Sequence, residues 1–335
     1  MAMERFRRAD EYARHPQTRN DTPLPGVIDT IGLGYAALMV KPLIVLPPIL
    51  LDLYLWLGMR VTARPLTLEA AAWFRDEGAD GRAIASDLER FERTNVLELL
   101  SLRLPTFRMP TVVANLDAAR LDRFGLTFEL TSLPWWLVVA ISIVAFAVGI
   151  ILGAGWLLAV AWVATGVGTL RDVVRPRVML GRALAIGGWI AAVLGLFLLV
   201  SSPFIAGLVF GAMLGLNGLG LIILILLFPA AWGYMFFFFS VQAIAVDRIG
   251  AFAALRASYK VVRGYFWQST RFIILSLTIT TGFPFALRVF TSNPAGLTLA
   301  IVLNAFIASG MIAAAMLFYR DRARRLGLPA YAAER

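Results

Sequence analysis

The longest uncharged stretch of the sequence covers the 64 residues from Ala183 to Val246, which include no Asp, Glu, Lys or Arg. A soluble domain does not avoid charge for this length, because its surface must face water. A helix rises 1.5 Å per residue, so about 20 apolar residues cross the roughly 30 Å of membrane hydrocarbon. The stretch therefore predicts two long membrane-spanning helices, at 184–206 and 214–245. Three shorter helices, broken at its prolines, are the alternative.

Further apolar runs repeat this signal along the chain. Hydrophobic residues make up 59% of the sequence and charged residues 16%, and the mean hydropathy is +0.76. The runs at 42–59, 134–170, 268–289 and 296–319 each predict one more span. We therefore expect an all-α fold, a polytopic transmembrane helix bundle of about six spans with amphipathic interfacial helices.

The polar segments divide the chain into regions. Lys41 and Pro42 interrupt the first apolar region, so an interfacial or re-entrant helix is expected at 27–40, ahead of the first span. The predicted organisation is a cytoplasmic tail at 1–26, the interfacial helix plus first span at 27–59, an extracytoplasmic amphipathic helical segment at 60–133, a five-span bundle at 134–319 with an interfacial helix at 249–266, and a basic cytoplasmic tail at 320–335.

The distribution of charge predicts the orientation. The net charge is +10, but residues 60–133 contain ten Arg against eleven acidic residues, so the basic excess lies in the other loops and tails. Basic loops stay on the cytoplasmic side of a membrane. Six spans place all strongly basic segments on that side, together with both termini. We therefore expect a multi-pass protein of the bacterial cytoplasmic (inner) membrane, and no binding to nucleic acid.

Several classes of chemistry lack their usual residues. The sequence has no Cys and one His, His15, which argues against thiolate or multi-histidine metal sites and against a Ser-His-Asp relay. It also shows no nucleophile elbow, Walker motif or paired-carboxylate arrangement. We expect no catalytic residues, no metal site and no cofactor, and hence no enzymatic activity.

The interfacial helix at 249–266 is the clearest candidate site. At 100° per residue, an apolar stripe falls at Phe252, Leu255, Tyr259, Val262 and Phe266. A basic stripe lies about 100° around the helix and consists of Arg256, Lys260 and Arg263. Such a helix lies along the membrane surface with its basic flank toward lipid phosphates. These three residues are therefore candidates for contact with lipid headgroups. The alternative is a basic loop that serves only to fix topology.

Three polar residues fall inside predicted spans. A carboxylate in a span is costly and usually faces protein or water, so Asp52 is a candidate for substrate binding. The alternative is a hydrogen-bonded Asp52 near the outer interface, bonded to neighbouring backbone or to an Arg of residues 60–133. Asn217 and Asn304 are the other intramembrane candidates, and hydrogen bonds between helices are the default interpretation for both.

One motif resembles a known group of proteins. Its residues are Ala254, Leu255, Ser258, Arg263, Gly264 and Trp267, with apolar spans on both sides. The pattern is similar to bacterial six-span membrane proteins of the YciC-like group and to the membrane domain found beside glycerophosphodiester phosphodiesterases. The resemblance covers about residues 183–320 and implies a topology. The phosphodiesterase domain is not in this sequence, so its activity is not implied.

The expected function follows from these features. Without a catalytic site, we expect a scaffold or accessory protein that contacts anionic membrane lipids, with a homo-oligomer or another membrane protein as further partners. The alternative is a transporter or permease-like subunit for a lipid or hydrophobic solute.

Overall fold

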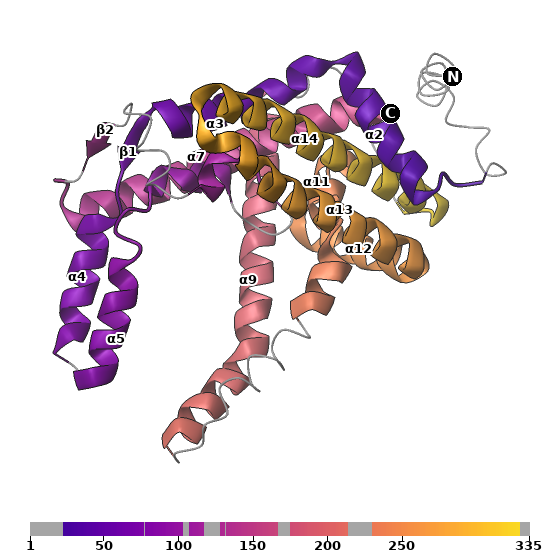
Figure 1. The fold of residues 1–335 in the computed structure, drawn as a ribbon. Coiled ribbons are helices and arrows are strands. Elements are labelled where there is room, and N and C mark those ends of the chain that lie inside the picture. Colours follow the sequence, from indigo (N-terminus) through magenta and orange to yellow (C-terminus); the bar gives the residue numbers. More distant parts are fainter. Residues whose placement is uncertain are drawn as a thin grey trace. The chain divides into compact units, whose positions relative to one another are not determined.

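The chain is almost entirely helical. The computed structural model describes residues 23–76, 78–102, 107–116, 128–130, 132–166, 175–213 and 230–328, and the structure is 83% helical (Figure 1). This confirms the all-α prediction. It also agrees with the sequence, in which the runs at 134–170, 183–246 and 296–319 carry no charge that would have to be solvated within a span.

Five helices among the described residues are long and apolar enough to cross a membrane. They are α7 (Trp135–Thr165), α9 (Pro176–Met213), the helical stretch Ala230–Asp247 that ends in α11 (Ser240–Asp247), α13 (Phe266–Leu287) and α14 (Pro294–Arg325). Residues 214–229 lie outside the described ranges, so the choice between two and three spans in 183–246 stays open.

The first apolar region is broken at the predicted place. Helix α2 (Val27–Val40) ends before Lys41, and η1 (Pro42–Val45) leads into α3 (Leu46–Leu57). The 12 residues of α3 rise only about 18 Å, which is short of the membrane thickness. The predicted span at 42–59 is therefore not a complete span by itself, but α2 and the 42–57 helix together would count as a sixth.

The described residues form two compact units. The first unit draws on 1–41, 157–277 and 310–335. In it, α2 packs closely against α14 through small residues. A Cβ built on Gly34 would lie 2.5 Å from the backbone nitrogen of Ala314, and one on Gly310 would overlap the ring of Tyr35. Small residues let two membrane helices approach to backbone contact, and no sequence pattern predicted this pair.

The C-terminal end of α14 is buried in the same unit. Arg320 and Arg322, at the start of the predicted basic tail, are 4% and 1% exposed and belong to the helix. Arg322 Nη2 donates to Gln268 Oε1 at 3.0 Å and to the Pro25 carbonyl at 3.3 Å. Its guanidinium also stacks on Phe318, 3.4 Å from the ring centre. These contacts explain how a guanidinium is accommodated without exposure to water.

The second unit draws on 42–156 and 278–309. It contains a hairpin of α4 (Arg64–Arg75) and α5 (Gly78–Glu89), which Figure 1 shows side by side. An ion pair between Arg75 and Glu89 joins the two helices. The unit also contains η2 (Val96–Ser101), η3 (Val113–Asn115) and η4 (Arg288–Ser292).

A short parallel ribbon in this unit was not predicted. Strand β1 (Met59–Val61) pairs with β2 (Phe128–Leu130), and the pair Arg60 and Glu129 sits in register. Three residues are too few to show the alternation that identifies a strand in sequence. The Asn95 side chain caps η2 and joins it to β1: it accepts from the Leu97 N–H at 3.1 Å and from the Val61 N–H at 3.2 Å.

Candidate functional site

The candidate site is built on α12 (Ala251–Gly264), at the position predicted for the interfacial helix. Gly250 provides the extended residue ahead of the helix, and Arg263 in the last turn is favourable to the helix dipole. The residues buried against the rest of the unit are Ala254, Ala257, Ser258, Val261 and Val262. Helix α12 therefore contacts the protein mainly through small and β-branched residues.

The predicted apolar stripe does not form this contact. Phe252 is 72% exposed and Tyr259 is 42% exposed, whereas Val262 is the one member of the stripe that is fully buried. Small residues permit close helix packing in a membrane protein, and large apolar side chains are as stable in lipid as in a core. Phe252 and Tyr259 thus lie outside the packed face of α12, whereas Val262 belongs to it.

Ser258 fixes α12 to the helix before it. The helical stretch 230–247 is interrupted by turn residues at Phe238 and Phe239. At this interruption the Ser258 hydroxyl donates to the Phe236 carbonyl at 2.7 Å and accepts from the Phe239 N–H at 3.1 Å. The hydroxyl satisfies a buried N–H that the interrupted helix does not bond. This gives a structural role to the serine of the motif noted in the sequence.

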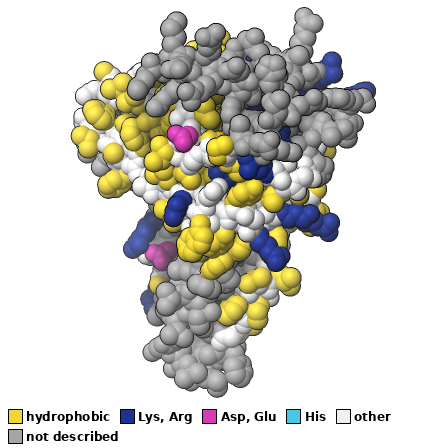
Figure 2. All heavy atoms as spheres, turned by 90° about the vertical axis from the view of Figure 1, so that its right-hand side faces the viewer, with side chains coloured by type: hydrophobic (Ala, Val, Ile, Leu, Met, Phe, Trp, Pro, Cys, Tyr) yellow, Lys and Arg dark blue, Asp and Glu magenta, His cyan; other side chains and the backbone are white. Residues whose placement is uncertain are grey.

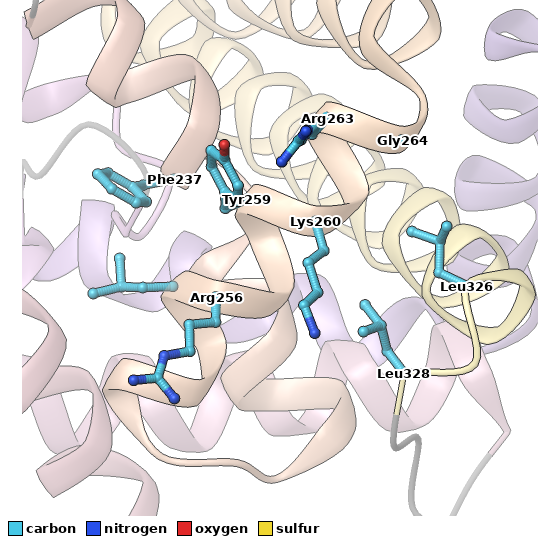
Figure 3. A pocket seen from close by; sticks show the side chains of 9 residues that line it. Phe237, Arg256, Tyr259, Lys260, Arg263, Gly264, Leu326 and Leu328 are labelled. Atoms are coloured by element: carbon cyan, nitrogen blue, oxygen red, sulfur yellow. The ribbon is translucent and has the colours of Figure 1, made fainter.

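The outer side of α12 forms a groove of about 710 Å³, here called the α12 groove (Figure 3). Arg256, Lys260 and Arg263 extend from α12 along it, and Leu326 and Leu328 approach from the end of α14. Gly264 allows this approach, since a Cβ there would lie 3.3 Å from Leu326. The lining residues are Phe237, Leu255, Arg256, Tyr259, Lys260, Arg263, Gly264, Leu326 and Leu328.

The α12 groove combines an apolar lining with positive charge. Arg256, Lys260 and Arg263 make no ion pair or hydrogen bond with any residue in the described ranges. Two of the acidic residues described in this unit are engaged elsewhere: Asp247 accepts from the Tyr319 hydroxyl at 2.6 Å, and Asp321 pairs with Arg320 at 3.2 Å. Among the residues that the structure describes, no acidic side chain lines the groove. Its charge is therefore not compensated by the described side chains that surround it.

The surface around α12 shows the same combination. Figure 2 views the side of the molecule on which α12 lies in Figure 1, and Lys and Arg side chains stand there among hydrophobic ones. Apolar side chains next to cations suit an amphipathic anion, which places its acyl part on the former and its phosphate on the latter. Within the described ranges, no three His, Asp or Glu side chains are grouped to hold a metal ion.

The structure brings Asp52 to a polypeptide segment far away in sequence. Its carboxylate is fully buried and accepts hydrogen bonds from the Thr111 hydroxyl, from the Val112 N–H at 2.9 Å and from the Val113 N–H at 3.2 Å. Asp52 therefore anchors this segment to α3, and the partners found here are a hydroxyl and two backbone N–H groups rather than an Arg. No sequence pattern identified Thr111 as its partner.

The two asparagine candidates differ in outcome. Asn304 is buried on α14 and lines a small polar cavity of the second unit. Asn217 lies outside the described residues. The basic candidates Arg256, Lys260 and Arg263, by contrast, come together in one groove.

Similarity to known proteins does not indicate what the α12 groove binds. Comparisons with protein-family models, with curated proteins and with solved structures find no match to this chain. The resemblance to the YciC-like and phosphodiesterase-associated membrane proteins thus stays a prediction. The shape and charge of the α12 groove are the observations that bear on function.

Proposed function

We propose that this protein is a non-enzymatic, multi-pass membrane protein that binds an anionic phospholipid in the α12 groove. It would act as a scaffold or accessory protein in the bacterial cytoplasmic membrane, with both termini in the cytoplasm. One observation carries the proposal: Arg256, Lys260 and Arg263 line an apolar groove that no acidic side chain of the described residues lines.

The proposed position explains both faces of α12. Its packed face holds it against the neighbouring helices, while Phe252 and Tyr259 are exposed on the other side. At a membrane surface these aromatic side chains would enter the headgroup region, where aromatic rings are stable. The adjacent cations would then lie at the level of the lipid phosphates.

The charge predicts a measurable preference for anionic lipid. Each Lys or Arg near an anionic membrane surface contributes about 1 kcal/mol, so three would contribute roughly 3 kcal/mol, or about 100-fold in affinity. A loop that only fixes topology would attract anionic lipid through its total charge. A binding groove would depend on these three positions in particular.

The test compares two variants of equal charge. In the groove variant, Arg256→Gln, Lys260→Gln and Arg263→Gln are combined. In the control variant, Arg175→Gln, Arg177→Gln and Arg271→Gln remove three exposed arginines of the same unit that do not line the groove.

Each protein is purified from membranes in neutral detergent, and the lipid that co-purifies is quantified by mass spectrometry. We expect the ratio of phosphatidylglycerol to phosphatidylethanolamine to fall toward the bulk membrane value in the groove variant alone. Equal ratios in the two variants would show that total charge, and not the groove, retains the lipid.

A further inference from the structure

A second cavity lies in the other structural unit, between residues 108–111 and the helices α13 and α14. It has a volume of about 120 Å³. The residues that matter for its chemistry are Arg108 and Thr111 from the segment that Asp52 anchors, Thr280 and Pro284 from α13, and Asn304 and Ala308 from α14. We call it the Arg108 cavity.

A proline explains why a cation reaches this cavity. Pro284 has no N–H, so it cannot donate to the carbonyl of Thr280 four residues earlier in α13. Arg108 Nη2 donates to that carbonyl at 3.2 Å. The Thr280 carbonyl thus holds the Arg108 guanidinium in the cavity wall.

Asn304 is the second observation that points to a ligand. It is 3% exposed and lines the cavity. It forms no hydrogen bond with any residue in the described part of the chain. An amide that lines a cavity without a protein partner usually bonds a water or a ligand. Its side chain can donate to an anion that also contacts Arg108.

The neighbouring carboxylate is already bonded. Asp52 does not line the cavity, and its oxygens accept from Thr111, Val112 and Val113. The Thr111 hydroxyl, which lines the cavity, uses its proton in this bond, so it does not donate to a ligand. Recognition of an anion would therefore depend on Arg108 and Asn304.

We propose that the Arg108 cavity binds a small oxyanion, a phosphate or carboxylate group, between the Arg108 guanidinium and the Asn304 amide. Its 120 Å³ would hold about four waters at ~30 Å³ each. That space suits one such group and is too small for an acyl chain. The inference concerns a different site from the α12 groove and does not depend on it.

The chain offers a direct test because it has no native cysteine. Ala308→Cys places one thiol in the cavity wall, and Thr298→Cys places one on an exposed part of α14 as the control. The full-length variants are reconstituted in phosphatidylcholine nanodiscs. Labelling rates are then measured with an anionic and with a cationic methanethiosulfonate reagent.

We expect the thiol at position 308 to react at least tenfold faster with the anionic reagent than with the cationic one. Inorganic phosphate should slow this reaction when compared with sodium chloride of equal ionic strength. Arg108→Gln, which retains a donor for the Thr280 carbonyl, should abolish the charge preference, and Asn304→Leu should weaken the protection by phosphate. The thiol at position 298 should show none of these effects.

A second arm distinguishes the source of the oxyanion. Protection by inorganic phosphate would assign a free anion, whereas protection that requires phosphatidylglycerol in the nanodisc would assign a lipid headgroup. Equal rates with both reagents and no protection in either arm would mean that the cavity holds water only, which overturns the proposal.

If the thiol at position 308 prevents folding or does not react, thermal unfolding of the native sequence replaces it. Stabilisation by phosphate relative to chloride that is lost in Arg108→Gln supports the site. Its absence refutes it.

Discussion

Removal of the Ser258 hydroxyl tests how α12 is held in place. Ser258→Ala deletes one oxygen that accepts from the Phe239 N–H and donates to the Phe236 carbonyl. Phe239 and Ser258 are fully buried, so water cannot replace the lost bonds. A buried polar group left without its partner costs about 1–3 kcal/mol. The two groups together predict a loss of roughly 2–6 kcal/mol in the free energy of unfolding.

Ser142→Ala is the matched control. The Ser142 hydroxyl donates to the Val138 carbonyl, four residues earlier within α7, at 2.7 Å. That carbonyl keeps its helical N–H donor when the hydroxyl is removed. The same chemical change should therefore cost less than about 1 kcal/mol.

The assay is equilibrium unfolding in mixed micelles, in which sodium dodecyl sulfate is titrated into neutral detergent and tryptophan fluorescence is followed. We expect the Ser258→Ala transition at clearly lower denaturant than that of Ser142→Ala. If the two variants unfold together, the Ser258 bridge does not stabilise the interrupted helix, and the assignment of α12 as a firmly held element is refuted.

Two further substitutions test the remaining packing assignments. Asp52→Asn keeps one acceptor oxygen but turns an NH₂ group toward groups that are themselves donors. Hydrogen bonds to a charged group contribute about 1.5–3 kcal/mol, so we expect the free energy of unfolding to fall by roughly 2–4 kcal/mol in the same titration. An unchanged transition would exclude the anchor to Thr111. Gly34→Leu would place a side chain against the backbone of Ala314, which overpacks the contact of α2 with α14. We expect a marked drop in monodisperse protein on size-exclusion chromatography, whereas Gly32→Leu, where a Cβ meets nothing within 4 Å, should behave like the native sequence.

The spans and the basic stripe follow from sequence because each depends on a local pattern. A charge-free run of 64 residues has no stable location outside a membrane or a very large core. A period of 3.6 residues places Arg256, Lys260 and Arg263 on one flank of a helix. The structure then brings all three to one groove.

The packed faces could not be assigned in the same way. In water, a large apolar stripe marks the buried side of a helix, but in a membrane protein it is equally stable against lipid. The side of α12 that contacts the protein is therefore the one with Ala254, Ala257 and Ser258, which hydrophobicity alone does not identify. The pairing of Gly34 with Ala314 escaped prediction for the same reason.

Contacts between distant parts of the chain were also beyond sequence reasoning. Asp52 meets Thr111 across 59 positions, and Arg108 meets Thr280 across 172. Neither pair has a fixed spacing that would reveal it. Only the polar character of Asp52 and Asn304 within apolar runs signalled that a partner or a cavity was needed.

The binding of an anionic lipid in the α12 groove can be measured directly as contact between the lipid headgroup and the groove wall. Leu328→Cys, on the groove wall opposite the cations, carries a fluorophore in the otherwise cysteine-free chain. Quenching by headgroup-labelled nitroxide phosphatidylglycerol is compared with quenching by the same label on phosphatidylcholine. We predict preferential quenching by phosphatidylglycerol that the combined Gln substitutions at 256, 260 and 263 abolish. Equal quenching by both lipids in the native groove would contradict the account.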